Sequence, residues 1–296
     1  MTFRKLNKAQ QILLKMRGSE LYKNYKFLSR LHDLPIYLPD GIAAHKTEIH
    51  FRHSGNAGDI MYAIPAMYAL AKNRKIHLHL NINARGDYGK MKHPLGTVML
   101  NQQMADMLQP LVLNQPSFAS CSAYHGEPVD VDLDQFRKYP FNYRTGNICR
   151  WYFLTFGING DLSKPWLHAL PDPSFKNTIV IARSRRYRNP GIDYSFLSQF
   201  TDTAFVGLPD EYEDMKKMIP NIRYVGVSNF LEMASVIAGS KFFIGNQSLP
   251  FSIAEGLKTK RILEVFHLSP NVIVEGSNGY DFCYQPQFEK IVREMD

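Results

Sequence analysis

The segment from residue 241 to residue 265 constrains the fold most, because it has the order strand, polar turn, short helix, strand. Lys241–Ile244 is a short apolar run, which predicts a buried parallel strand. Pro250 suits the first position of a helix, and Arg261–Val265 predicts the next strand. Such a unit leaves a helix N-terminus, with free backbone N–H groups, at the carboxyl edge of a parallel sheet. We therefore expect a phosphorylated or nucleotide ligand near Ser248.

A second unit of the same kind lies far upstream. Glu48–Phe51 predicts a strand, a glycine-broken turn follows it, and Ile60–Lys72 repeats apolar residues at helical spacing. In the turn, Gly55 and Gly58 permit positive φ and a close approach of the backbone. Asp59 falls at or just before the first helical turn, where a carboxylate is favoured. It is therefore either a simple N-cap or a functional carboxylate.

Length, cysteines and hydropathy limit the class of protein. The chain has 296 residues, enough for one large or two medium domains, and 45% of them are hydrophobic. Cys121, Cys149 and Cys283 form neither a disulfide framework nor a C-x-x-C metal pair, which favours a reducing compartment. No apolar run is long enough for a transmembrane helix, and the N-terminus lacks an apolar signal core. We expect the protein to be cytoplasmic, or to act in the host cytoplasm if it is viral. The sequence does not determine its oligomeric state.

The charge of the chain favours a polyanionic partner. Its formal net charge is +8, with a pI near 9.2, which suits nucleic acid, phosphorylated lipid or nucleotide. Residues 1–34 form a basic extension with a helical pattern of leucines. This extension is expected either to pack on the adjacent domain or to serve as a docking helix, a nucleic-acid arm or a membrane-surface helix.

The rest of the chain alternates strand and helix signals, which predicts parallel sheets covered by helices. A proline-containing stretch, residues 161–177, indicates a linker between an N-terminal domain, residues 35–165, and a C-terminal domain, residues 166–296. In the first domain we expect helices at Val98–Leu108 and Ile148–Phe156 and a loop-rich stretch at residues 115–134. In the second, the expected strands are Thr178–Ala182, Thr203–Gly207 and Ile222–Val225, and the expected helices are Ser195–Phe200, Asp210–Met218 and Phe230–Ala238.

Four arginines follow the first strand of the C-terminal domain, at positions 183, 185, 186 and 188. Ligands of open α/β sheets bind at the carboxyl ends of strands, and arginine is the usual bidentate partner of phosphate. We expect Arg183, Arg185 or Arg186 to contact a diphosphate, with Ser184 in the same loop. The alternative is a solvated, charged face.

Further polar residues lie around the Ser248 turn. Glu255, one turn into the following helix, is expected either to accept hydrogen bonds from ribose hydroxyls or to face solvent. Gln247 and Ser248 are candidate phosphate donors or a turn-forming and capping pair. His77 and His79 share a strand face but lack a third ligand nearby in the sequence, so we expect no metal site. No H-E-x-x-H, Walker-type or G-x-S-x-G motif is present.

HSGNAGDIMYAIPAMYAL, starting at His53, and FLEMASVIAGSKFFIGNQSLPFSIAEGLKTKRILEV, starting at Phe230, carry a family resemblance. The first resembles the N-terminal strand–loop–helix of the ADP-heptose:lipopolysaccharide heptosyltransferases, glycosyltransferase family 9, and the second resembles their donor segment. The likeness extends over Phe51–Leu70 and Thr178–Val265, and is thin over residues 75–172. The family's donor turn reads Asp-Ser-Gly-Pro-x-His, whereas this chain has Asn246, Gln247, Ser248, Leu249, Pro250 and Phe251.

The resemblance implies an α/β chain of the GT-B fold, in which two Rossmann-like domains with parallel sheets face each other across a cleft, without a metal requirement. It implies that Asp59 is the general base, with His53 the next candidate. The acceptor-side loop would comprise Ser54, Gly55, Asn56 and Gly58, and the donor side would add Asn246, Gln247, Ser248 and Glu255 to the arginine loop.

The expected function is that of an inverting, metal-independent glycosyltransferase. It would need no cofactor, and its donor would be a UDP- or ADP-linked sugar. The acceptor is expected to be a polyanion, either a lipopolysaccharide-type glycan or DNA with hydroxymethylated bases. The alternatives are a nucleotide-sugar epimerase of the same fold and a non-catalytic nucleic-acid-binding protein.

Overall fold

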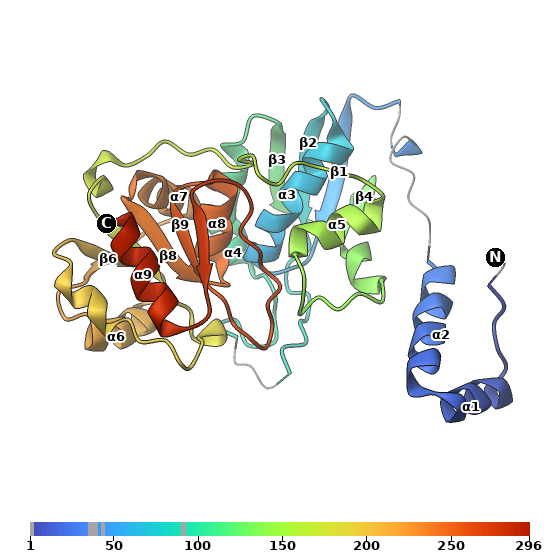
Figure 1. Cartoon of the computed structure of the whole chain (residues 1–296). Helices are drawn as coiled ribbons and strands as arrows, with labels where there is room; N and C mark the ends of the chain where they lie inside the picture. Colours follow the sequence, from blue (N-terminus) through green and yellow to red (C-terminus); the bar gives the residue numbers. More distant parts are fainter. Residues whose placement is uncertain (1–2, 35–40, 43–44, 90–92) are drawn as a thin grey trace.

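The computed structural model describes residues 3–34, 41–42, 45–89 and 93–296. Figure 1 shows two α/β domains side by side, with a helical hairpin beside the N-terminal domain, on the side away from the C-terminal domain. All strand pairs within the two sheets are parallel. The fold is therefore the predicted α/β architecture of two Rossmann-like domains.

The N-terminal domain contains a four-stranded sheet of order β3-β2-β1-β4. Its strands are β1 (Glu48–His53), β2 (Lys75–Leu80), β3 (Phe118–Ala123) and β4 (Val131–Asp132), and its helices are α3 (Ala57–Ala71), α4 (Gln102–Leu113), the 3₁₀ helix η2 (Leu133–Lys138) and α5 (Ile148–Phe156). Strand β1 alternates, with Ile49, Phe51 and His53 fully buried and His50 and Arg52 only partly buried. Helix α3 is buried along most of its length because it is apolar nearly all round.

The C-terminal domain contains a six-stranded sheet of order β10-β9-β8-β5-β6-β7. Its strands are β5 (Ile179–Ala182), β6 (Thr203–Val206), β7 (Arg223–Val225), β8 (Phe242–Asn246), β9 (Arg261–Glu264) and β10 (Gly279–Phe282). Its helices are α6 (Pro209–Met218), α7 (Phe230–Gly239), α8 (Leu249–Leu257), α9 (Gln285–Met295) and the 3₁₀ helices η3 (Pro173–Phe175), η4 (Arg185–Tyr187) and η5 (Ser195–Gln199). Strands β5, β6, β8 and β9 are buried throughout, as the apolar residues at their centres predict, and the buried polar residues lie at the strand ends.

Several elements differ from the expectation. The stretch 115–134 was expected to be loop-rich but supplies β3 and β4, whose small and polar residues hide the strand signal. The helix expected to begin at Val98 begins at Gln102, because the Asn101 side chain accepts a hydrogen bond from Met104 N and caps it there. The helix over Ile148–Phe156 is confirmed. Strand β10 and helix α9 were not predicted, although Phe288, Ile291, Val292 and Met295 of α9 recur at helical spacing.

The two domains meet where α3 packs against α8. A Cβ on Gly58 would lie 3.7 Å from the Leu249 Cα, so the first turns of the two helices approach closely. From the linker, Trp166 Nε1 donates to Met61 O at 3.2 Å. The carboxyl ends of β1 and β8, each followed by a helix N-terminus, therefore lie at one junction.

The basic extension forms a hairpin of two helices, α1 (Lys8–Arg17) and α2 (Ser19–His32). Lys5 Nζ donates to Asp33 at 2.8 Å, and Leu6 N donates to the Tyr25 hydroxyl at 2.9 Å, which holds the hairpin closed. Neither helix has a buried residue. No helix in the described part of the chain is long and apolar enough to cross a lipid bilayer.

Candidate active site at the domain junction

Asp59 is the third residue of α3, directly after the turn that follows β1. Asn56, not Asp59, occupies the N-cap position, so the simple capping role is wrong. Asn56 Nδ2 donates to Asp59 Oδ2 at 3.4 Å, and the Tyr88 hydroxyl donates to Asn56 Oδ1 at 2.6 Å. The Asp59 side chain keeps 27% of its surface exposed. It is thus oriented by neighbours and still reachable from solvent.

Arg137, from the end of η2, supplies the positive charge nearest to Asp59. Its Nη2 lies 3.7 Å from Asp59 Oδ2, and its Nη1 donates to Asp134. Asp134 in turn accepts from Ser54 N at 3.1 Å and Ser54 Oγ at 2.6 Å. Burial raises the pKa of Asp59, and the Arg137 guanidinium opposes that rise. Nothing in the sequence marked Arg137, because its contact with Asp59 depends on the path of the chain after β4.

His53 has a structural role, so its candidacy as the base is corrected. Its side chain is fully buried. Gly55 N donates to its Nδ1 at 2.8 Å, and its Nε2 lies 2.7 Å from the Tyr152 hydroxyl. The first bond leaves the proton on Nε2, which donates to Tyr152. Burial lowers the pKa of His53 to about 3, so the ring is neutral and both of its nitrogens are engaged.

The two glycines of this turn contribute space and not an unusual backbone. Neither Gly55 nor Gly58 has a positive φ, which corrects that part of the expectation. A Cβ on Gly55 would collide with the His53 ring and the Arg137 guanidinium. A Cβ on Gly58 would be in ordinary van der Waals contact with α8. The absence of a side chain at Gly55 therefore leaves the room that brings Arg137 close to Asp59.

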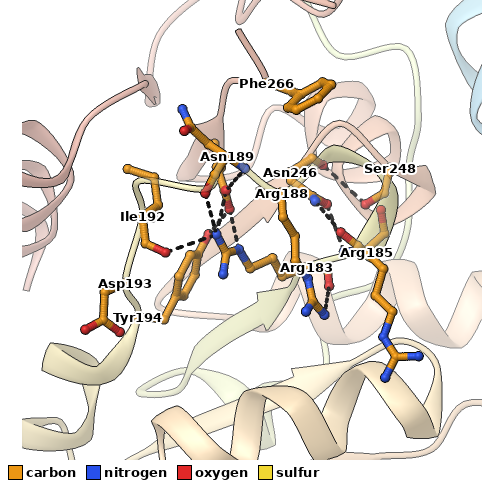
Figure 2. Close-up of polar contacts among 12 residues, drawn as sticks. Arg183, Arg185, Arg188, Asn189, Ile192, Asp193, Tyr194, Asn246, Ser248 and Phe266 are labelled. Carbon is orange, nitrogen blue, oxygen red and sulfur yellow. Dashed lines mark hydrogen bonds and ion pairs between the residues drawn. The ribbon is translucent and has the colours of Figure 1, made fainter. Parts of the chain in front are cut away.

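The arginines of the loop after β5 differ in role: some are paired within the fold, and others are available to bind a ligand. The expectation that Arg183 contacts a diphosphate is corrected. Its Nε and Nη2 donate to Glu264 Oε2 and Oε1 at 2.6 and 2.7 Å, and both side chains are buried. Arg183 Nη2 also lies 3.3 Å from Asn189 O and 3.2 Å from Ile192 O. Figure 2 shows its guanidinium among Asn189, Ile192 and Tyr194, whereas Arg185 extends away from it. Arg183 therefore holds the loop in place.

Arg185 and Arg186 differ in their partners. Arg185 pairs with Asp210 and Asp214 on α6 at 2.5 and 2.7 Å, although its side chain is half-exposed. Arg186 has no ion-pair partner among the described residues and lies over the Tyr187 ring at 5.4 Å. Its charge lowers the pKa of Asp59 by a smaller effect than that of Arg137, so the two residues interact electrostatically across the domain junction. Arg186 is the arginine available to an anionic ligand.

The loop is tied to the end of β8 by an amide. Ser184 N donates to Asn246 Oδ1 at 2.9 Å, and Asn246 Nδ2 donates to Ser184 O at 2.7 Å. The Ser184 hydroxyl is buried without a hydrogen-bond partner in the structure. Ser248 precedes α8 without capping it through its side chain, so first-turn N–H groups of α8 remain available to an anion. Asn246 therefore positions Ser184 beside the end of β8, which leads into the first turn of α8.

Gln247 and Glu255 are used within the fold, which corrects both as ligand contacts. Gln247 Nε2 donates to Ser269 O at 2.6 Å, and its Oε1 accepts from Phe266 N at 2.7 Å. Glu255 is only 1% exposed and accepts from Arg261 Nε at 2.5 Å, so it neither faces solvent nor reaches a ribose. Both side chains fasten the segment after β9 to the α8 unit.

Sequence comparisons find no matching protein-family model and no matching curated protein. Solved structures do match. E. coli heptosyltransferase WaaC with ADP-2-deoxy-2-fluoro heptose has a TM-score of 0.56 and 10% identity, over 84% of this chain and 100% of that one. WaaC with ADP gives 0.57 and 10% over the same shares. A family 9 glycosyl transferase from Veillonella parvula DSM 2008 gives 0.52 and 12%, over 84% and 88%. The chain has the two-domain GT-B fold of heptosyltransferase-like glycosyltransferases.

Proposed function

We propose that the protein is an inverting, metal-independent glycosyltransferase that uses a nucleotide sugar. The observation that carries the proposal is the position of Asp59, a partly exposed carboxylate in the first turn of α3, beside the N-terminus of α8 from the other domain. The N-terminal domain would bind the acceptor through the Ser54–Gly58 loop. The C-terminal domain would bind the donor through Arg186, Ser184 and the first turn of α8.

In the proposed reaction, Asp59 takes the proton of an acceptor hydroxyl, and that oxygen attacks the anomeric carbon. The bond between this carbon and the diphosphate oxygen breaks, and the nucleoside diphosphate leaves with the electron pair. Arg186 and the N–H groups of α8 would stabilise the negative charge that develops on the leaving group. The raised pKa of Asp59 suits a base, because it strengthens the carboxylate as a proton acceptor.

We propose a UDP- or ADP-linked donor, and the ADP-linked alternative is supported by WaaC, which was solved with ADP and with ADP-2-deoxy-2-fluoro heptose. We propose a polyanionic acceptor because the chain carries a net charge of +8. A lipopolysaccharide-type glycan and DNA with hydroxymethylated bases both meet this condition. The α1–α2 hairpin would contribute to acceptor binding.

The test is turnover of a panel of nucleotide sugars with each acceptor class and with none. Asp59→Asn keeps the shape and the bond from Asn56, so we expect normal folding and donor affinity with a rate about 10²–10⁴-fold lower. Wild-type turnover by this variant, with an unchanged melting curve, would remove Asp59 as the base. Conversion of the donor without any acceptor would instead favour an epimerase, and binding of DNA without any turnover would favour a non-catalytic protein.

A further inference from the structure

One face of the N-terminal sheet carries a group of imidazoles far from Asp59. Strands β1 and β2 alternate, so Ile49, Phe51, Ile76 and Leu78 lie in the core with α3. Their neighbours on the opposite face are Glu48, His50, Arg52, His77 and His79. Parallel sheets usually bury both faces under helices. Polar residues along this face therefore need an explanation of their own.

The strand register brings the imidazoles together. His50 lies opposite His77 in the ladder, and their rings stack with centroids 4.5 Å apart. His50 Nδ1 lies 2.9 Å from His79 Nε2. Glu48 Oε2 lies 3.4 Å from His77 Nε2. One ligand atom each from Glu48, His50 and His77 all lie within 4.8 Å of one another.

The hydrogen bonds around the rings favour tautomers with free lone pairs. His77 Nδ1 lies 2.8 Å from Ser120 Oγ on β3, so an Nδ1–H donor leaves the lone pair on Nε2. That Nε2 is buried and has no hydrogen bond. By the same logic, His50 Nδ1–H donates to His79 Nε2 and leaves a lone pair on His50 Nε2. His79, only 7% exposed, then directs Nδ1–H toward Glu127, 3.9 Å away.

We propose that Glu48, His50 and His77 bind a divalent transition-metal ion of the Zn²⁺ class. Imidazole nitrogen and carboxylate oxygen are the ligands that such ions take, and a ligand's second ring nitrogen commonly donates to a neighbouring oxygen or other acceptor. Ser120 and His79 are placed to do this for His77 and His50. The ion also satisfies His77 Nε2, which is otherwise a buried polar atom without a partner.

This site serves the architecture of the sheet and not the transfer reaction. Glu48 begins β1, whereas Asp59 lies beyond its other end, and six residues of strand span about 17 Å. The ion bridges β1 and β2 on the face opposite α3.

The experiment uses the full chain, stripped with a chelator, and titrates it with ZnCl₂ and, separately, CoCl₂ by calorimetry. We expect one ion per chain and a rise in melting temperature that grows with metal concentration. His77→Gln and His50→Gln should abolish both effects, and Ser120→Ala should weaken binding about 10–100-fold. His168→Gln, at an exposed histidine elsewhere, is the matched control and should bind like the wild type.

Circular dichroism of each variant establishes that it is folded before it is titrated. Equal affinity in the wild type and in a folded His77→Gln variant would show that the metal binds other histidines, which overturns the proposal. Absence of binding by the wild type overturns it as well. Neither result bears on glycosyl transfer, because none of these residues contacts the Asp59 site.

Discussion

At the residue scale, the candidate site depends on two opposed effects on one carboxylate. Burial raises the pKa of Asp59, and the charges of Arg137 and Arg186 lower it. Arg137 belongs to the same domain as Asp59, and its Nη2 lies 3.7 Å from Asp59 Oδ2. The protonation of Asp59 therefore depends in part on a residue outside the recognisable motif.

Arg137→Gln tests this balance. Removing the positive charge should raise the pKa of Asp59 further, so the acid limb of the kcat/KM profile should move to higher pH. At a pH below the wild-type midpoint, both proteins should be less active than at their own plateaus. The ratio of plateau kcat/KM to low-pH kcat/KM should be larger for the variant than for the wild type. Arg150→Gln, which removes an exposed arginine beside Glu275, should leave the limb in place. An unmoved limb in the Arg137 variant would contradict the electrostatic link.

His53 gives a second prediction, for stability. Its folded-state pKa is about 3, below the ordinary 6.5, so the unfolded chain binds a proton that the folded protein excludes. This contribution is complete above pH 6.5 and is lost as pH falls toward 3, by at most about 1.4 kcal/mol per pH unit. His53→Gln should be less stable at pH 7 but lose less stability on acidification, as measured by urea unfolding at several pH values. A slope equal to that of the wild type would count against a neutral, buried His53.

At the element scale, a buried ion pair holds the loop after β5 to the carboxyl end of β9. Arg183 from β5's loop and Glu264 from β9 pair with both partners buried, and the Tyr194 hydroxyl donates to the same carboxylate at 2.9 Å. Breaking such a pair is costly because one charge stays buried without its partner. This arrangement holds the backbone that presents Ser184 and Arg186.

Arg183→Met and Arg186→Ala should therefore have opposite consequences. The first should lower the free energy of unfolding by about 3–5 kcal/mol and weaken nucleotide binding less than the second, because Arg183 acts on the ligand only by holding the loop. The second should leave stability within about 0.5 kcal/mol and weaken nucleotide binding by about 1–3 kcal/mol. Arg293→Ala breaks only an exposed pair with Glu289 and serves as the control. Reversed results for the two variants would return Arg183 to the donor site.

At the scale of the whole molecule, charge and apolar surface concentrate in the hairpin. Residues 1–34 contain eight Lys or Arg and two acidic residues. Ile12, Met16 and Leu21 are among several large apolar side chains that are more than half exposed there. The helices of this segment have no buried residue, so they contribute little to the hydrophobic core. An exposed surface that is both basic and apolar is typical of a binding surface.

Deleting residues 1–34 should leave the melting temperature nearly unchanged and weaken binding to polyanionic acceptors. The logarithm of affinity should fall less steeply with the logarithm of salt concentration, because fewer counterions are released. A variant with Leu21→Ser and Leu28→Ser retains every charge and should keep the wild-type salt slope. If the deletion changes neither affinity nor slope for any of the DNA and glycan acceptors, the hairpin has no role in acceptor binding.

The sequence alone determined the strand–turn–helix units, because these depend on local signals. Short apolar segments predicted β5, β6, β8 and β9, and an apolar and aromatic stretch predicted α5 over Ile148–Phe156 with correct bounds. Glycines and a short apolar strand likewise placed Asp59 at the start of a helix. Strands β3 and β4 escaped prediction because short strands with small or polar residues take their identity from their neighbours in the sheet.

Only the tertiary structure decided which polar side chains are free. Arg183 and Arg186 are chemically identical and three positions apart, yet one is buried against Glu264, 81 residues away, and the other faces Asp59. Glu255 became part of a buried ion pair with Arg261, and the register of β1 and β2 supplied Glu48 and His50 to the histidines of β2. Such pairings join residues that are distant in the sequence. The cost of burying a charge is offset only when an opposite charge lies beside it, and the position of that partner is set by the tertiary structure.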